Sequence, residues 1–166
     1  MKKEIIEQGD ANSVKLGYGG MLNLRNVLIN SFVFETYRAL QICYQQLQGT
    51  GNTIQSHQSF ILEGMAHVIS GSLVVRSLST KHQAFMKALQ TNIKEALKDL
   101  AELHTMIAGY KAHFSWASVR YIRECLLRVT VGNLALSGAV RYGIQVPSVT
   151  YEGDNRVMMK QVSKDN

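Results

Sequence analysis

The longest periodic pattern in the chain runs from Thr80 to Tyr110. Apolar side chains recur there at steps of three and four residues, and lysines and an aspartate occupy positions between them. The apolar positions are Phe85, Met86, Leu89, Ile93, Ala96, Leu97, Leu100, Leu103 and Ile107. This spacing predicts an amphipathic helix about 45 Å long, at about 1.5 Å per residue. Because such a helix needs partners of similar length, the sequence predicts an all-α fold, an elongated antiparallel four-helix bundle.

Three other segments carry helical patterns, and we expect them at about residues 21–48, 56–78 and 116–142. The middle one contains Gly64 and Gly71, which lower its helix propensity. These glycines indicate either a close approach of a neighbouring helix or a bend.

The boundaries of the long helix follow from its flanking polar residues. Thr80 and Gln83 have the spacing of a capping box, which predicts a helix start at this point. Gly109 is expected to end the helix, and Ser115 is a candidate N-cap for the last helix of the bundle.

Irregular arms are expected on both sides of the bundle. The first arm, residues 1–20, is rich in glycine, and the second, residues 144–166, contains Pro147 and a short alternating apolar pattern. Either arm could include a short strand. The predicted organisation is therefore an N-terminal arm (1–20), a four-helix bundle (21–143) and a C-terminal arm (144–166).

Composition adds a positive charge to this picture. The 166 residues include 18 lysines and arginines against 12 acidic residues, which gives a net charge of +6 and a pI near 9.4. A polyanion such as nucleic acid is the commonest partner of such a field, although an excess of this size is also ordinary in soluble proteins.

The cysteines and the apolar runs bear on location. Cys43 and Cys125 lie in helical patterns without C-x-x-C spacing, which indicates buried free thiols in a reducing compartment. The N-terminal sequence has no apolar leader region, and no uninterrupted apolar run approaches the length of a membrane span. We therefore expect a cytoplasmic protein.

No catalytic or metal-binding pattern stands out. The five histidines form no H-x-x-x-H or H-E-x-x-H pair, and Glu63 and Glu102 lack the spacing of a di-iron bundle. A hydrogen-bonded pair of His67 with His104 inside the bundle is the simpler expectation. Gly17–Gly20 is followed by neither the lysine nor the hydroxyl of a phosphate-binding loop. The sequence thus predicts a protein that is not an enzyme and uses no metal or other cofactor.

Cationic helix faces are the best functional candidates. Planar guanidinium groups suit phosphate oxygens, and several such contacts along a rod would bind nucleic acid without reading its sequence. Acidic residues interleaved on the same faces leave open a purely solvated surface with local ion pairs. The candidate nucleic-acid-binding residues are Arg120, Arg123, Arg128, Arg141, Lys87, Lys94, Lys98 and Arg76.

Three short motifs resemble a known family. They are Phe34-Glu35-Thr36-Tyr37, then Leu97, Leu100 and Leu103 followed by Met106 and Ile107, and the turn Phe114-Ser115. With the helix lengths, they are similar to the ribosomal RNA intervening-sequence proteins and the accessory variability determinant proteins of retroelements. That resemblance implies a basic bundle assembled as a homo-oligomer, usually a pentamer, which binds nucleic acid or a reverse transcriptase.

The sequence therefore favours a non-enzymatic, self-associating accessory protein that binds nucleic acid or a reverse-transcriptase-like enzyme. Two alternatives share the same fold. One is a structural assembly subunit of a virion or a secretion machine, and the other is an adaptor that covers a protein partner with its helices. No feature of the sequence identifies the partner.

Overall fold

The computed structural model describes residues 15–49, 59–128, 143 and 146–165. Within these ranges the chain forms helices and no strand. In chain order the elements are the π-helical turn η1 (Lys15–Gly19), α3 (Gly20–Gly49), α4 (Phe60–Thr91), α5 (Ile93–Arg128), the 3₁₀ turn η3 (Val146–Val149) and α7 (Asn155–Asp165). The all-α class and the elongated bundle of four α-helices are confirmed for this part of the chain.

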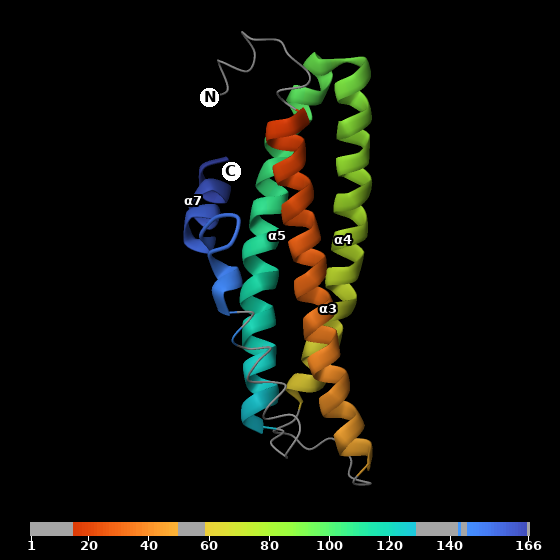
Figure 1. The fold of residues 1–166 in the computed structure, drawn as a ribbon, viewed down its shortest axis with the longest axis vertical. Coiled ribbons are helices and arrows are strands. Elements are labelled where there is room, and N and C mark those ends of the chain that lie inside the picture. The colour runs from red at the N-terminus through yellow and green to blue at the C-terminus, as the bar shows by residue number, and fades with distance from the viewer. Residues whose placement is uncertain (1–14, 50–58, 129–142, 144–145, 166) are drawn as a thin grey trace.

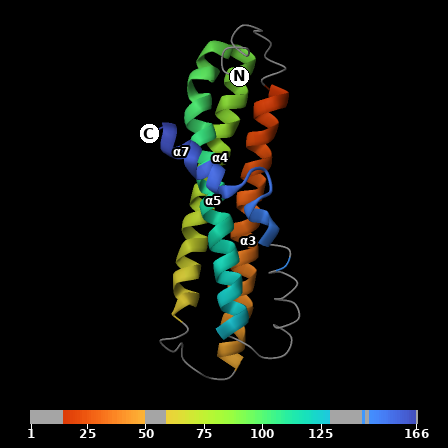
Figure 2. The same cartoon turned by 90° about the vertical axis from the view of Figure 1, so that its left-hand side faces the viewer.

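Three long helices, α3, α4 and α5, lie side by side, and each runs antiparallel to the one before it (Figure 1). The fourth helix, α7, has 11 residues and crosses the outer side of α5 (Figure 2). Because α5 contacts α3, α4 and α7, it is the helix around which the bundle is organised.

The break between the second and third helices lies at Asn92, not at Thr80. Asn92 has an extended backbone (φ −149°, ψ 93°), and its N–H donates to the Ala88 carbonyl at 2.7 Å. Its own carbonyl accepts from Ala96 N at 3.1 Å and so opens α5. The capping-box prediction was wrong because the hydroxyl of Thr80 donates back to the Arg76 carbonyl inside a continuous α4. The predicted single helix from Thr80 to Tyr110 is thus the end of α4 joined to the start of α5.

The predicted break at Gly109–Ser115 is also absent, because α5 continues through it to Arg128. Ser115 is buried in the helix, where its hydroxyl donates to the Ala112 carbonyl at 3.2 Å and accepts from Asn155 of α7 at 2.7 Å. A polar residue that binds another helix from mid-helix carries the same sequence signal as an N-cap. The second half of the helix expected at 116–142 lies outside the described residues.

The C-terminal arm is helical where it is described, and the expected strand character is wrong there. Asp154 caps α7, since its carboxylate accepts from the backbone N–H groups of Arg156 and Val157 at 2.9 and 3.4 Å. Met158 then packs against Ala108 and Ala112 of α5. The arm is therefore docked on the bundle. Most of the N-terminal arm lies outside the described residues, and its last residues belong to η1.

The main core lies between α3, α4 and α5. Its fully buried side chains include Leu22, Ile29 and Leu40 of α3, Ile61 and Leu78 of α4, and Ile107 and Ile122 of α5. Gly71 is needed for this packing, because a Cβ there would lie 2.7 Å from both Phe114 Cε1 and Val33 Cγ2. The close helix approach expected of Gly64 and Gly71 is present, with Leu40 Cδ1 2.7 Å from a Cβ at Gly64.

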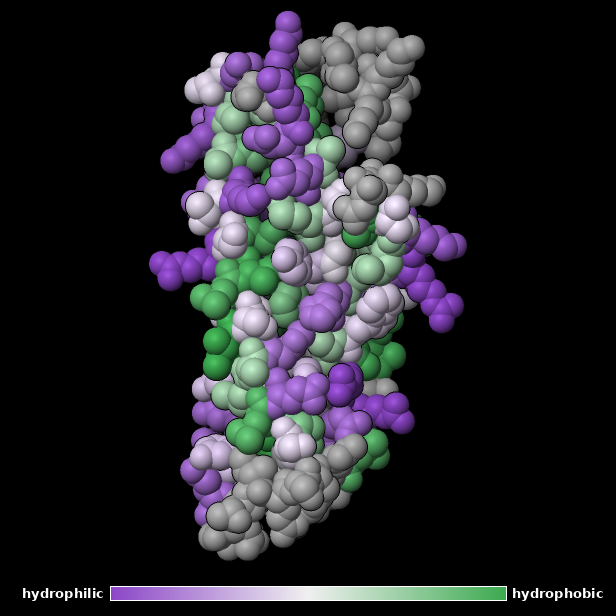
Figure 3. Space-filling model, turned by 180° about the vertical axis from the view of Figure 1, so that it is seen from behind, coloured by the Kyte–Doolittle hydropathy of each residue, from purple (hydrophilic) through white to green (hydrophobic). Residues whose placement is uncertain are grey.

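The helix α4 is long and apolar enough, by length and mean hydropathy, to meet the criteria for a membrane span. Core helices of soluble proteins meet the same criteria, and α4 packs against α3 and α5 along the bundle. It also exposes Leu62, Ile69 and Leu73. Figure 3 shows hydrophobic side chains on one face of the molecule, interspersed with hydrophilic ones.

Candidate functional site

The turn between η3 and α7 holds the most unusual backbone among the described residues. Glu152 has φ 56° and is the one residue other than glycine with positive φ in that part of the chain. A bulky side chain in this region costs of order 1–3 kcal/mol and persists only where the surroundings enforce it. Backbone hydrogen bonds from Thr150 N to Pro147 O (3.0 Å) and from Gly153 N to Thr150 O (3.2 Å) define the turn. We call residues 149–155 the Glu152 turn.

Lys111 of α5 lies beneath the Glu152 turn, with none of its side chain exposed to solvent. Its ammonium donates to the Gly153 carbonyl at 2.8 Å, to Asn155 Oδ1 at 2.9 Å and to the Val149 carbonyl at 3.5 Å. Burial, together with the positive charge of Arg25, lowers the pKa of Lys111 from 10.5 to about 8.

Asn155 continues this buried network into α5. Its amide Nδ2 donates to Ser115 Oγ at 2.7 Å and to the Ala112 carbonyl at 3.4 Å. Since Asn155 is also the first residue of α7, the same side chain fixes the start of that helix. Lys111, Asn155 and Ser115 thus bind the turn to α5 through buried polar groups that are hydrogen-bonded to one another and to the backbone.

Arg25 of α3 holds the turn from the other side. Its Nε donates to the Glu152 carbonyl at 3.1 Å, and its Nη1 lies 3.2 Å from His104 Nε2 of α5. Burial lowers the pKa of Arg25, and the negative charge of Glu152 acts in the opposite direction. Residues from α3, α5 and the start of α7 therefore meet at a single turn.

Glu152 itself is exposed to solvent. Its carboxylate makes no hydrogen bond to any described residue, while its field acts on both Arg25 and Lys111. A carboxylate that is exposed and fixed on a strained backbone is a candidate proton acceptor.

Sequence reasoning missed Glu152, Lys111 and Arg25. One signal was available for Lys111, because it lies among Ile107, Ala108 and Ala112 on an apolar helix face, where a charge requires a partner. The positive φ of Glu152 had no comparable signal, since the neighbouring Gly153 is the residue that such a turn would ordinarily use.

Among the described residues, those predicted to bind nucleic acid are spread along α4 and α5. Arg120 pairs with Glu63 at 3.3 Å on the exposed side of α4 and α5. Lys94 and Arg120 are both on α5 but about 39 Å apart at about 1.5 Å per residue. The remaining exposed members are Arg76, Lys87, Lys98 and Arg123. The side chain of Arg128 and the whole of Arg141 lie outside the described residues.

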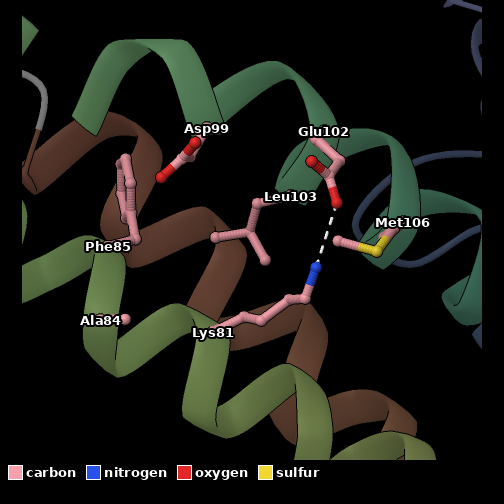
Figure 4. Close-up of a pocket in the computed structure, with 7 residues that line it drawn as sticks. All are labelled: Lys81, Ala84, Phe85, Asp99, Glu102, Leu103 and Met106. Carbon is pink, nitrogen blue, oxygen red and sulfur yellow. Dashed lines mark hydrogen bonds and ion pairs between the residues drawn. The ribbon is translucent and has the colours of Figure 1, made fainter. Parts of the chain in front are cut away.

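A groove of about 260 Å³ lies near the junction of α4 and α5. It is lined by Lys81, Ala84, Phe85, Asp99, Glu102, Leu103 and Met106, with an ion pair of 3.0 Å between Lys81 and Glu102 (Figure 4). The lining converges no nucleophile with a base, and the ion pair is half-exposed. We therefore do not take this groove as the functional site.

The expected pairing of His67 with His104 is wrong. The ring of His67 lies 5.1 Å from that of His113 and 5.0 Å from that of Phe114, whereas His104 contacts Arg25. Burial lowers the pKa of His67. Within the described residues, no group of three or more His, Cys, Asp or Glu side chains is placed to hold a metal ion.

Comparison with known proteins identifies the family. The sequence profile described as acyl-CoA oxidase, C-alpha1 domain, matches residues 18–165. The chain therefore belongs to the acyl-CoA oxidase C-alpha1 domain family. This match includes α3, α4, α5, the Glu152 turn and all of α7.

Individual relatives agree with that assignment. The chain is 27% identical over 164 residues to peroxisomal acyl-coenzyme A oxidase 1 of Rattus norvegicus, covering 92% of this chain and 25% of the rat protein. It is 30% identical over 84 residues to the Mus musculus protein and 36% identical over 90 residues to the Homo sapiens protein of the same name. The latter two matches cover 49% of this chain and 13% of each relative. The chain thus spans about a quarter or less of the relatives that it matches, and no solved structure matches it.

These findings correct the functional predictions. The resemblance to ribosomal RNA intervening-sequence and retroelement accessory proteins was wrong, because the residues that carried it lie in an acyl-CoA oxidase domain. Leucines at helical spacing occur in any bundle. The expectations of a non-enzymatic protein and of nucleic acid or a reverse transcriptase as partner are overturned by the same match, and the pentamer implied by that resemblance loses its basis. The relatives are named as peroxisomal proteins, which does not support the cytoplasmic location that we expected.

Proposed function

We propose that this chain is the C-alpha1 domain of an acyl-CoA oxidase and that Glu152 is the base that removes a proton from the acyl chain. The observation that carries the proposal is the strained, fixed backbone of an exposed carboxylate, Glu152, within the part of the chain that matches the family. The substrate class is an acyl-coenzyme A, and the location is the peroxisome, as in the names of the relatives.

The chemistry of an acyl-CoA calls for such a base. Oxidation of the acyl chain breaks C–H bonds, and the bond beside the thioester carbonyl is the most acidic one, because the negative charge left at C2 spreads onto the carbonyl oxygen. A positioned carboxylate can accept that proton, and general bases of this kind contribute about 10²–10⁴-fold to a rate. Glu152 has the required side chain, and its backbone is held by Arg25 on one side and by the residues bound to Lys111 on the other.

The family also implies a flavin adenine dinucleotide. The groove that the described residues form between α4 and α5 does not fit that group. The groove of Figure 4 carries Asp99 and Glu102, whose charges would repel the diphosphate of the dinucleotide. We therefore assign no residue of this domain to the flavin and derive no step that uses it.

The proposal is tested in an oxidase chimera, in which this chain replaces the aligned segment of the rat oxidase. The parent chimera should consume O₂ when an acyl-CoA is added, and Glu152→Gln should lower the turnover by about 10²-fold or more, because glutamine cannot accept the proton. Binding of the acyl-CoA should remain.

Asp154→Asn is the matched control. It removes a carboxylate two positions away, while asparagine retains the cap of α7. Turnover of the Glu152→Gln chimera within twofold of the parent, or an equal loss in Asp154→Asn, would contradict the assignment of Glu152.

A further inference from the structure

Lys111 is a fully buried charged residue, and its burial carries a large cost in free energy. It is the largest of the fully buried side chains, and it lies on a face of α5 that otherwise packs with alanine and isoleucine. Removing an ammonium group from water costs several kcal/mol unless its protons find acceptors. A hydrophobic residue at this position would dock α7 without that cost.

The acceptors of Lys111 show what the charge is used for. They are the carbonyls of Val149 and Gly153 and the side chain of Asn155, so they flank Glu152 on both sides. No acceptor on α3 or α4 is involved in these contacts. The ammonium therefore joins the two ends of the Glu152 turn to one point on α5.

We propose that Lys111 is a positioning residue that holds the Glu152 turn closed and so fixes the direction of the Glu152 carboxylate. The importance of this role for the reaction rests on the proposed function of Glu152, whereas the closure of the turn does not. Arg25 adds a second constraint through the Glu152 carbonyl, but its hydrogen bond reaches only one atom of the turn.

The charges around Lys111 give the closed turn a pH dependence of known sign. The positive charge of Arg25 disfavours the protonated form of Lys111, while the negative charges of Glu152 and Asp154 favour it. His104 contacts Arg25. Burial is the largest influence and lowers the pKa of Lys111. Opening of the turn would hydrate the lysine and return its pKa toward the ordinary value, so opening takes up a proton. Consequently, the turn should be held more firmly as the pH rises from about 8 toward 10, because the neutral amine of Lys111 can still donate hydrogen bonds to the turn without the cost of burying a charge.

Amide hydrogen exchange of the 166-residue chain tests the closure directly. The probes are the amides of Thr150 and Gly153, whose hydrogen bonds define the turn. Lys111→Met should speed their exchange by roughly tenfold or more, because each hydrogen bond from a charged donor contributes about that factor or more. Core amides of α4 should keep their protection. The control is Lys87→Met, an exposed lysine of the same charge.

Unchanged exchange at Thr150 and Gly153 in Lys111→Met would overturn the proposal. If that variant loses protection throughout the chain, Lys111→Gln decides the question, because glutamine keeps a hydrogen-bond donor but is too short to reach both ends of the turn. Faster exchange at Thr150 and Gly153 in Lys111→Gln, with the α4 core still protected, supports the proposal, and exchange at the parent rate would overturn it.

The role in the reaction is read from the oxidase chimera. Lys111→Met should lower kcat by about tenfold to a hundredfold and leave KM nearly unchanged, since a base displaced by about 1 Å loses rate but not binding. An unchanged kcat would overturn the link between turn closure and the reaction. If Glu152→Gln also has no effect on turnover while Lys111→Met opens the turn, the proposed function fails and the closure of the turn by Lys111 stands.

Discussion

Lys111 and Gly153 are 42 positions apart in the sequence, yet the ammonium of the first donates to the carbonyl of the second at 2.8 Å. This contact joins the middle of the longest helix to the residue that follows the strained Glu152. It docks the C-terminal arm on α5 and so makes this arm part of the candidate site.

The strain at Glu152 should be measurable as lost stability. Glycine adopts positive φ without a steric cost, so Glu152→Gly should raise the free energy of unfolding by about 0.5–1 kcal/mol. Reversible urea denaturation of the isolated chain measures it. Asp154→Gly, which removes the cap of α7, should change stability in the opposite direction. A loss of stability in Glu152→Gly would show that the carboxylate contributes to the fold.

The core between α4 and α5 depends on Leu103. Its side chain is buried, so Leu103→Ala should cost about 2–5 kcal/mol of unfolding free energy through lost contacts and a cavity. Leu73→Ala, at a side chain that is 64% exposed, should change it by less than about 0.5 kcal/mol. Equal effects of the two substitutions would mean that the packing of α5 differs from the one described.

Gly71 limits how closely α4 approaches its neighbours. A methyl group there would meet Phe114 and Val33 at 2.7 Å, so Gly71→Ala should destabilise the chain by about 1–3 kcal/mol despite the better helix propensity of alanine. Gly20 has open space around its Cβ position, and Gly20→Ala should be nearly neutral. Thermal unfolding of both variants distinguishes the two cases, and a stabilised Gly71→Ala would argue against the close approach.

The buried charge of Lys111 should appear in the pH dependence of global stability. Its pKa falls from 10.5 to about 8 on folding, so between these values the unfolded chain holds a proton that the folded chain has released. The free energy of unfolding should therefore rise with pH across this window, by linkage. Lys111→Met should lack that rise. Burial also raises the pKa of Tyr121, but this contribution is common to both proteins and cancels in the comparison. Identical pH profiles of parent and variant would contradict the buried ammonium.

The fold class followed from the sequence because apolar spacing reports which faces are buried, and that spacing is strong from Phe85 to Ile107. The ends of the helices were harder to predict from the sequence. Thr80 and Ser115 have hydroxyls that satisfy backbone carbonyls within a helix, and such residues carry the same signal as caps. The true break at Asn92 is made by one extended residue with no glycine or proline beside it.

The candidate site was harder to predict than the fold. Its parts come from α3, α5 and the start of α7, and they meet only once the C-terminal arm folds back onto α5. Arg120 and Arg123 were predicted to bind nucleic acid because their positive charge can be read directly from the sequence. The functional hypothesis failed there, since a net charge of +6 does not distinguish a polyanion-binding surface from an ordinary soluble one.

The most direct test of the central claim follows the proton itself. The oxidase chimera is incubated, without O₂, with an acyl-CoA that carries deuterium at C2, and the loss of deuterium to water is measured by mass spectrometry. The account predicts that the parent chimera and Asp154→Asn release the label and that Glu152→Gln releases it at least about 10²-fold more slowly while still binding the thioester. Release by Glu152→Gln at the parent rate would show that another group removes the proton and would contradict the account.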